Sequence, residues 1–246
     1  MAARLGAERD EERRAWLTRA SVRVGPEMAL ALADALSGTT DRFARHAFVD
    51  AMVRLGDVAM PVIEEMVEDP RWFVVRNAVS VLGQAGGERA VELIVSTLAH
   101  ADGRVRREAI LALAKVGGTD AGMLVYGMLE DPDPEVRLAA TMAAGTLKVE
   151  RSLRPLLSLL EEETDHDVVV GVLGALGKLG DPGAVPAIEK RTVSTLLARQ
   201  PTNVRIAAYR ALGAIRTPHA KSLLVRAADD RNPDVKAAVR ELLGMR

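Results

Sequence analysis

The sequence contains no cysteine, which excludes a disulfide framework, a thiolate metal site and a cysteine nucleophile. Aromatic residues make up only 3% of its 246 residues, so the aromatic bias of a sheet protein is missing. The formal net charge is −1, whereas a dedicated nucleic-acid binder normally carries a basic stripe. No apolar run approaches the roughly 18–20 residues of a membrane-spanning helix, and the N-terminus lacks a signal-type apolar segment. We therefore expect a cytoplasmic protein for which membrane contact is absent and nucleic-acid binding is disfavoured.

Recognisable catalytic motifs are also missing. The chain has no Gly-x-Ser-x-Gly elbow, P-loop or His-Glu-x-x-His segment. His46 and Asp50 have the i,i+4 spacing of residues that share a helix face, but two ligands without a third make a poor metal site. The sequence therefore predicts no catalytic residue, no bound metal and no cofactor.

What the chain does contain is a motif that recurs about every 31 residues. It reads Val-Arg-x-x-Ala-x-x-x-Leu-Gly-x-x-Gly, usually after an Asp-Pro-like start. The anchoring residue of each copy is Arg13, Ala44, Val74, Val105, Val136, Val168, Val204 or Val235. Self-similarity at such a period indicates a solenoid, in which stacked units share a continuous core. We therefore assign residues 1–246 to a single repeat domain.

Each copy reads as a helical hairpin. Asp133 is a good N-cap, and Pro134 fits the first helical position because its missing N–H is not needed there. Apolar residues four and eight positions after each anchor form one buried helical stripe. Glycine twelve positions after the anchor, as at Gly180, suits the left-handed residue that ends a helix. A second helix follows, which predicts an all-α solenoid of about seven and a half hairpins.

This motif resembles HEAT repeats, specifically the short bacterial type called PBS-lyase HEAT-like repeats. The matching segments include Asp133-Pro134-Glu135-Val136-Arg137 and Ala211-Leu212-Gly213. The resemblance covers essentially the whole chain and implies an α-solenoid whose second helices line the concave face. Relatives include bilin-lyase subunits, iron-dependent hydroxylases and plain scaffolds. The hydroxylases bind iron through His-Glu pairs, and no histidine of this chain is followed by glutamate.

Two repeated features have competing interpretations. Arginine follows the anchor in most copies, as at Arg137 and Arg205, and forms either a ligand-binding row or a ladder with the N-cap aspartates. Glycines 171, 174, 177 and 180 recur along one helix, each interior one costing about 0.5–1 kcal/mol relative to alanine. That helix is therefore either soft or a place of close backbone approach.

An aromatic cluster is the first candidate binding site. Most copies place a charged or polar residue just before the anchor, but two copies place Phe43 and Phe73 there, with Trp72 adjacent. Because successive units stack in register, we expect these side chains to lie together on one edge as an exposed patch that binds a partner. The competing interpretation is that local packing covers them.

A groove lined by the second helices is the other candidate site. Its outward side chains are expected to include Glu92, Met123, Tyr126, Arg151, Arg154 and Lys190. Residues 191–203 carry a five-residue insertion, which is either a bespoke contact or a tolerated surface change. The last copy has no second helix, so Leu242 and Leu243 are expected to be incompletely covered, which would permit self-association.

The sequence thus predicts a non-enzymatic adaptor that binds another protein, of unknown identity, through this groove and the aromatic edge. The alternatives are a bilin-lyase-type subunit, which would need a tetrapyrrole pocket, and, less favoured, a DNA-binding HEAT-like module.

Overall fold

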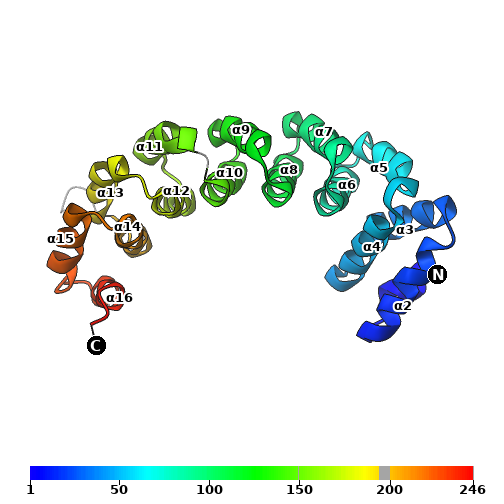
Figure 1. The fold of residues 1–246 in the computed structure, drawn as a ribbon, viewed down its shortest axis with the longest axis horizontal. Helices are drawn as coiled ribbons and strands as arrows, with labels where there is room; N and C mark the ends of the chain where they lie inside the picture. The colour runs from blue at the N-terminus through cyan, green and yellow to red at the C-terminus, as the bar shows by residue number, and fades with distance from the viewer. Residues whose placement is uncertain (149, 194–199, 246) are drawn as a thin grey trace. The chain divides into compact units, whose positions relative to one another are not determined.

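The computed structural model describes residues 1–148, 150–193 and 200–245, and these residues form helices joined by short loops, without a strand. The predicted all-α solenoid of HEAT-like hairpins is confirmed (Figure 1). The chain divides into two compact units, Met1–Val116 and Gly117–Arg246, and each is described by itself. The assignment of the whole chain to one domain stays a prediction.

Long and short helices alternate from α4 to α15. Unit 1 contains α1 (Ala2–Ala7), α2 (Glu11–Val22), α3 (Pro26–Gly38), α4 (Arg42–Leu55), α5 (Met60–Val67), α6 (Trp72–Ala85), α7 (Glu88–Ser96) and α8 (Gly103–Val116). Unit 2 contains α9 (Thr119–Gly127), α10 (Pro134–Leu147), α11 (Leu153–Glu162), α12 (His166–Leu179), α13 (Val185–Thr192), α14 (Thr202–Ile215), α15 (Pro218–Ala227) and α16 (Pro233–Leu242). From α2 to α15 the helices follow one another in pairs, and α16 comes last, as the repeat count predicts.

The core consists of the stripe that the repeat predicts. Every anchor except the exposed Arg13 is buried, and so is every residue four positions further on. The slot eight positions after the anchor is also buried, apart from the half-buried Leu243. Burying these aliphatic side chains is the main term that stabilises each unit, at about 25 cal/mol per Å² of apolar surface.

The helix ends are set by the polar residues of the repeat. The Asp133 carboxylate accepts a hydrogen bond from the Glu135 amide at 2.9 Å, as an N-cap should. Gly180 ends α12 in the left-handed region with φ of 72°. Where the repeat lacks glycine, Lys148 and Arg216 still adopt left-handed φ values of 50° and 58°. Because an L side chain there costs roughly 1–2 kcal/mol, these two C-caps are strained.

Close helix approach depends on small residues in the long helices. A Cβ added to Gly145 of α10 would lie 2.7 Å from the Cα of Ala175 in α12. A Cβ on Gly177 would lie 3.0 Å from the Cα of Ala211 in α14. In contrast, no atom lies within 4 Å of the Cβ position at Gly174. The glycines of α12 therefore do permit close backbone approach at Gly177, whereas Gly174 leaves open space.

This packing decides which helices face inward. In unit 2 the first helices of the hairpins, α10, α12, α14 and α16, lie on the inner side of the curve, and the second helices, α11, α13 and α15, lie on the outer side (Figure 1). The long helices also make the more extensive contacts with one another, because their small residues allow it. The expectation that the second helices line the concave face is therefore wrong for unit 2.

Candidate protein-binding surfaces

The aromatic side chains of the predicted patch lie at the starts of two helices of unit 1, Phe43 on α4 and Trp72 and Phe73 on α6. The rings of Trp72 and Phe73 meet edge to face, with centroids 5.9 Å apart and planes at 88°. Both rings are half-buried, whereas Phe43 on α4 is 52% exposed. Phe43 lies beneath Arg9, whose side chain lines the same cleft as Phe73. Local packing therefore covers Trp72 and Phe73 in part and leaves Phe43 open.

Arginine side chains cover each of the three rings. The guanidinium carbons of Arg9 and Arg42 lie 5.5 and 4.8 Å from the Phe43 centroid. Those of Arg76 and Arg104 lie 5.2 and 3.4 Å from the Trp72 centroid, and that of Arg71 lies 5.7 Å from Phe73. Sequence reasoning found the rings but missed these cations, although Arg42 and Arg71 directly precede the aromatic residues. We call this surface the arginine–aromatic edge, composed of Arg9, Arg42, Phe43, Arg45, Arg71, Trp72, Phe73, Arg76 and Arg104.

Loop aspartates hold three of these arginines in place. Arg71 pairs with Asp69 at 2.8 Å, Arg104 pairs with Asp102 at 2.6 Å, and Arg9 pairs with Asp41. The hydrogen bond from Arg104 is the main reason that the pKa of Asp102 falls to about 2. These aspartates therefore stay ionised over the physiological range and keep their arginines fixed.

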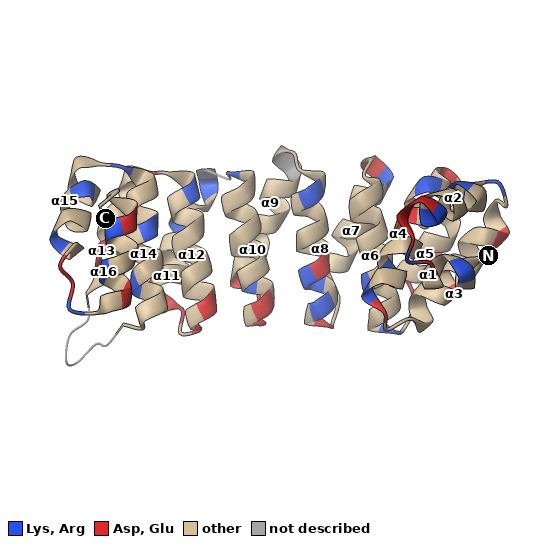
Figure 2. Ribbon diagram, turned by 90° about the horizontal axis from the view of Figure 1, so that it is seen from below, with Lys and Arg blue, Asp and Glu red and all other residues tan. Residues whose placement is uncertain are grey.

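The other three arginines of the edge have no ion pair with a carboxylate in the part of the chain that the structure describes. Arg42 lies on Phe43, and Arg45 donates a hydrogen bond to the Thr39 carbonyl at 3.3 Å while its Nε is buried without a hydrogen-bond partner. Burial lowers the pKa of the Arg76 guanidinium, and the charges of Arg45 and Arg104 lower it further against the attraction of Glu108. Arginines without an ion pair therefore outnumber free carboxylates on this edge, although Figure 2 shows both basic and acidic residues along α8.

A cleft of about 720 Å³ opens beside this edge in unit 1. It lies between α1, α3, α4 and the start of α6. Arg9, Arg71 and Phe73 line it together with the carboxylates of Asp34 and Asp41. The cleft thus carries both signs of charge and one aromatic wall.

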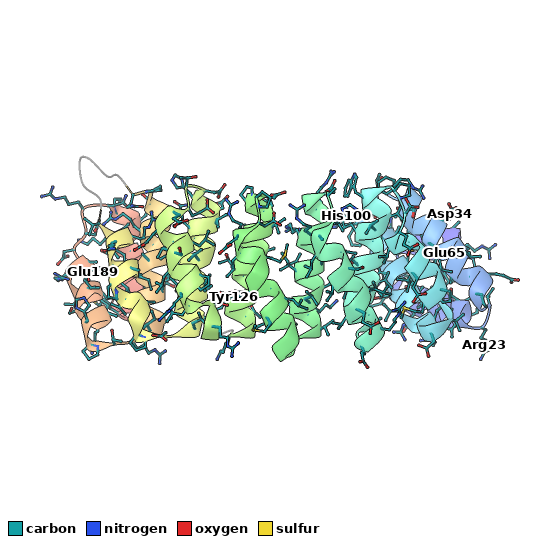
Figure 3. The ribbon with its side chains drawn as sticks, turned by 90° about the horizontal axis from the view of Figure 1, so that it is seen from above. Arg23, Asp34, Glu65, His100, Tyr126 and Glu189 are labelled. Carbon is teal, nitrogen blue, oxygen red and sulfur yellow. The ribbon has the colours of Figure 1, made fainter. Side chains whose placement is uncertain are left out.

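The six residues predicted to line the groove are exposed and come from several helices of the two units. Glu92 belongs to α7 of unit 1, where it pairs with Arg89 at 2.9 Å. The others belong to unit 2: Met123 and Tyr126 on α9, Arg151 just before α11, Arg154 on α11 and Lys190 on α13. Figure 3 shows Tyr126 from the side of the short helices. The residues of α11 and α13 lie on the outer side of unit 2, so the concave-groove placement is wrong for them.

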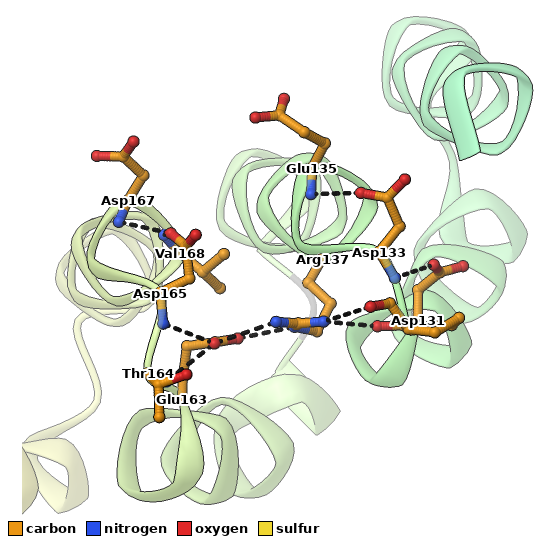
Figure 4. Close-up of polar contacts among 10 residues, drawn as sticks. Asp131, Asp133, Glu135, Arg137, Glu163, Thr164, Asp165, Asp167 and Val168 are labelled. Atoms are coloured by element: carbon orange, nitrogen blue, oxygen red, sulfur yellow. Dashed lines mark hydrogen bonds and ion pairs between the residues drawn. The ribbon is translucent and has the colours of Figure 1, made fainter.

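The arginine after the anchor has a structural role in the two copies of unit 2 that carry it, at Arg137 and Arg205, whereas Val169 and Lys236 occupy this position in the other two. Arg137 donates hydrogen bonds to the carbonyls of Asp131 and Pro132 at 2.9 and 3.1 Å and pairs with Glu163 at 2.7 Å (Figure 4). Arg205 likewise bonds the Thr192 carbonyl at 2.8 Å and pairs with Asp230. These arginines are largely buried and serve the fold rather than a ligand.

The carboxylates of the ladder differ from those expected. They lie five residues before the next anchor rather than at the N-cap, because the N-cap side chain is already bonded to backbone amides. The side chain in that slot accepts a hydrogen bond from the amide two residues later, as Glu163 does from Asp165 and Asp230 from Asn232, both at 2.9 Å. In the third copy, Val75 occupies the position of the arginine, and His100 occupies the position of the acid, five residues before the next anchor. Both partners of the ion pair are therefore replaced there.

Two further surfaces escaped the sequence analysis. In unit 2 a groove of about 520 Å³ runs between α12 and α14, with Gly174, Ile206 and Ala207 on its apolar lining and Lys178 and Arg210 beside them. In unit 1 the Trp16 side chain on α2 is 60% exposed. The sequence did carry a signal for this groove: small and apolar residues recur every three to four positions on the exposed side of residues 170–178 and 203–214.

The remaining expectations concern the ends of unit 2, metals and membranes. Leu242 is 40% exposed and Leu243 is half-buried, so they are incompletely covered, and self-association through them stays a prediction. Residues 194–199 of the 191–203 insertion lie outside the described residues. The described residues contain no group of three or more potential metal ligands and no helix that is long and apolar enough to cross a membrane.

The profile of HEAT repeats matches residues 59–122, 122–198 and 190–244, and the chain belongs to the HEAT-repeat family. No curated protein matched the sequence significantly.

Solved structures show the same fold. The complex of CpcE and CpcF of phycocyanin lyase from Nostoc sp. PCC7120 is 24% identical, with a TM-score of 0.55 over 75% of each chain. Kap95p, solved in a study of its binding to RanGDP, is 14% identical with a TM-score of 0.64, over 98% of this chain and 37% of that chain. An engineered protein is 18% identical with a TM-score of 0.52, over 99% of this chain and 77% of that chain. HEAT-type folds thus occur both in a lyase complex and in a protein-binding protein.

Proposed function

We propose that this chain is a non-enzymatic scaffold that binds another protein through the arginine–aromatic edge of unit 1. The observation that carries the proposal is the coverage of three aromatic rings by five guanidinium groups at one edge. Trp and Arg are among the residue types that contribute most to protein–protein binding when a partner desolvates them.

The edge is also fixed before a partner arrives. Arg71 and Arg104 are each held by two side-chain hydrogen bonds to an aspartate, at 2.8–2.9 Å for Arg71 and 2.6–2.9 Å for Arg104. Trp72 and Phe73 stand on the first turn of α6, a regular helix. Because these long side chains are already ordered, little rotamer entropy is lost on binding, which favours affinity.

The test is partner capture from the native extract, with the captured protein identified by mass spectrometry and then titrated in purified form. The double substitution Trp72→Ala and Phe73→Ala is expected to weaken binding at least about tenfold, the scale of a lost interface anchor. The matched control is Trp16→Ala, which removes an exposed aromatic side chain from α2 of the same unit and should leave capture unchanged.

Because Trp72 and Phe73 are half-buried, circular dichroism melting must accompany the double variant, and Arg42→Glu at an exposed site gives a second variant that spares the core. Capture that survives both changes in folded protein would remove the edge as the binding surface.

The lyase-subunit alternative has a separate test. Purified protein mixed with bilin and an apo-phycobiliprotein would change the bilin absorbance if the alternative holds, and we expect no change.

A further inference from the structure

The unpaired cations of the edge define the chemistry of the partner. We infer that the arginine–aromatic edge binds a segment of a partner protein in which Asp or Glu side chains alternate with apolar ones. This inference rests on the proposed function and narrows it. Its basis is that Arg42 lies on the exposed Phe43 ring and Arg76 on the half-buried Trp72 ring, and that neither arginine, nor Arg45 nearby, has a carboxylate partner among the described residues.

The carboxylates already present at the edge cannot neutralise these cations. Asp41 and Asp69 each accept a backbone amide hydrogen bond at 2.8 Å, and Asp102 accepts one at 2.9 Å. Each also pairs with its own arginine, so neither oxygen is free to turn toward a second cation. Asp34 is exposed near Arg71, and Glu108 attracts Arg76 without forming an ion pair with it among the described residues.

The arrangement leaves unused donors. The Arg76 side chain is half-buried and donates to the Asn77 carbonyl oxygen at 2.9 Å, a neutral acceptor. Arg45 Nε is buried without an acceptor, a cost of about 1–3 kcal/mol for a polar group. The buried Nε of Arg45 lies out of a partner's reach, but a planar carboxylate matches the fork of a guanidinium and would supply acceptors to the accessible N–H groups of Arg42 and Arg76.

The pattern of charge favours separate carboxylates over a continuous polyanion. Fixed aspartates alternate with the arginines at Asp41, Asp69 and Asp102. A nucleic-acid backbone, with a charge at every phosphate, would meet these carboxylates as well as the arginines. A peptide can place its carboxylates opposite the unpaired arginines and its apolar side chains against Phe43, which is 52% exposed.

The experiment measures fluorescence anisotropy of three labelled peptides with the full chain. The first alternates Glu and Leu, the second replaces each Glu by Gln, and the third replaces each Glu by Lys. A labelled double-stranded DNA of mixed sequence is the fourth probe. We expect the Glu peptide to bind, the Gln peptide to bind at least about tenfold more weakly, and the Lys peptide and the DNA to bind more weakly still.

Two charge-removing variants locate the binding. Arg42→Gln with Arg76→Gln should weaken binding of the Glu peptide about tenfold, whereas Arg89→Gln in the same unit should leave it unchanged, because Arg89 pairs with Glu64 and Glu92 away from the edge. Arg42→Gln alone, at an exposed side chain, should weaken binding severalfold and keeps the test decisive if the Arg76 substitution disturbs folding.

The outcomes separate this inference from the proposed function. Equal binding of the Glu and Gln peptides, equal loss with Arg89→Gln, or tighter binding of DNA would overturn the carboxylate inference. If partner capture depends on Trp72 and Phe73 yet survives loss of Arg42 and Arg76, the scaffold function stands and the acidic partner does not. If partner capture is unchanged by the substitution of Trp72 and Phe73, the proposed function itself fails.

Discussion

Alanine substitution of Gly145 and Gly174 in unit 2 tests whether small residues set the spacing of the inner helices. Both glycines lie inside long helices, Gly145 in α10 and Gly174 in α12. Alanine should gain about 0.5–1 kcal/mol of helix stability at either position, because it restricts the unfolded chain. The two sites differ only in what the new methyl group meets.

At Gly145 the methyl group would lie 2.7 Å from the Ala175 Cα and 3.0 Å from its Cβ. Backbone cannot rotate aside as a long side chain can, so α10 and α12 would have to separate locally. Overpacking of this kind costs about 1–3 kcal/mol, which after the helix gain leaves a net loss of up to about 2.5 kcal/mol. At Gly174 no atom lies within 4 Å, so the gain of about 0.5–1 kcal/mol should be retained.

Urea denaturation followed by far-UV circular dichroism measures both effects. Because both substitutions lie in unit 2, they act on the same transition even if the two units unfold separately. Gly177→Ala, with its methyl group 3.0 Å from the Ala211 Cα, should fall between the two. The packing explanation is refuted if Gly145→Ala raises the unfolding midpoint as much as Gly174→Ala does.

Two further predictions concern helix ends and the ladder. Lys148→Gly and Arg216→Gly should each raise the free energy of unfolding by about 0.5–1 kcal/mol by relieving left-handed strain, and Gly180→Ala should lower it by a similar amount; unchanged urea midpoints would contradict this. Burial raises the pKa of Glu163, but the Arg137 hydrogen bond and backbone amides outweigh it and leave that pKa below 4.5. The stability that ionised Glu163 contributes is therefore full above about pH 4.5 and is lost as the pH falls through the lower folded-state pKa. Glu163→Gln should lower the free energy of unfolding by about 1–2 kcal/mol at pH 7, and this gap to wild type should close in acid. A gap that is independent of pH in urea titrations would count against the ion pair.

The fold could be predicted from the sequence because the spacing of apolar residues within each repeat indicates a helical hairpin. Burial of the anchor and of the position four residues later depends only on helical periodicity, and both predictions hold from Val74 to Val235. The direction of curvature could not be predicted in this way, because it depends on how closely neighbouring helices approach. Contacts such as Gly83 with Ala112, where an added Cβ would lie 2.6 Å from the Ala112 Cβ, are between residues far apart in sequence.

The aromatic residues of the candidate site could be predicted from the sequence, but the arginines that cover them could not. Phe43, Trp72 and Phe73 stood out because sister copies are polar at the same position. Arg9 and Arg104, which cover these rings, come from neighbouring copies, so only the stacking reveals them. The carboxylate of the ladder was assigned to the wrong position because the sequence alone does not show that the N-cap oxygen is already used.

The ladder limits how such a chain can grow. Each bridge joins an arginine of one hairpin to an acid in the loop that begins the next, as Arg137 does with Glu163. A duplicated hairpin would therefore have to find the complementary charge on both of its new neighbours. At Val75 and His100 both the arginine and the acid of the ion pair are absent. A hairpin inserted at this junction would therefore leave its own arginine or acid without a partner. Engineered lengthening should accordingly be tolerated best at the junctions that follow Arg137 and Arg205.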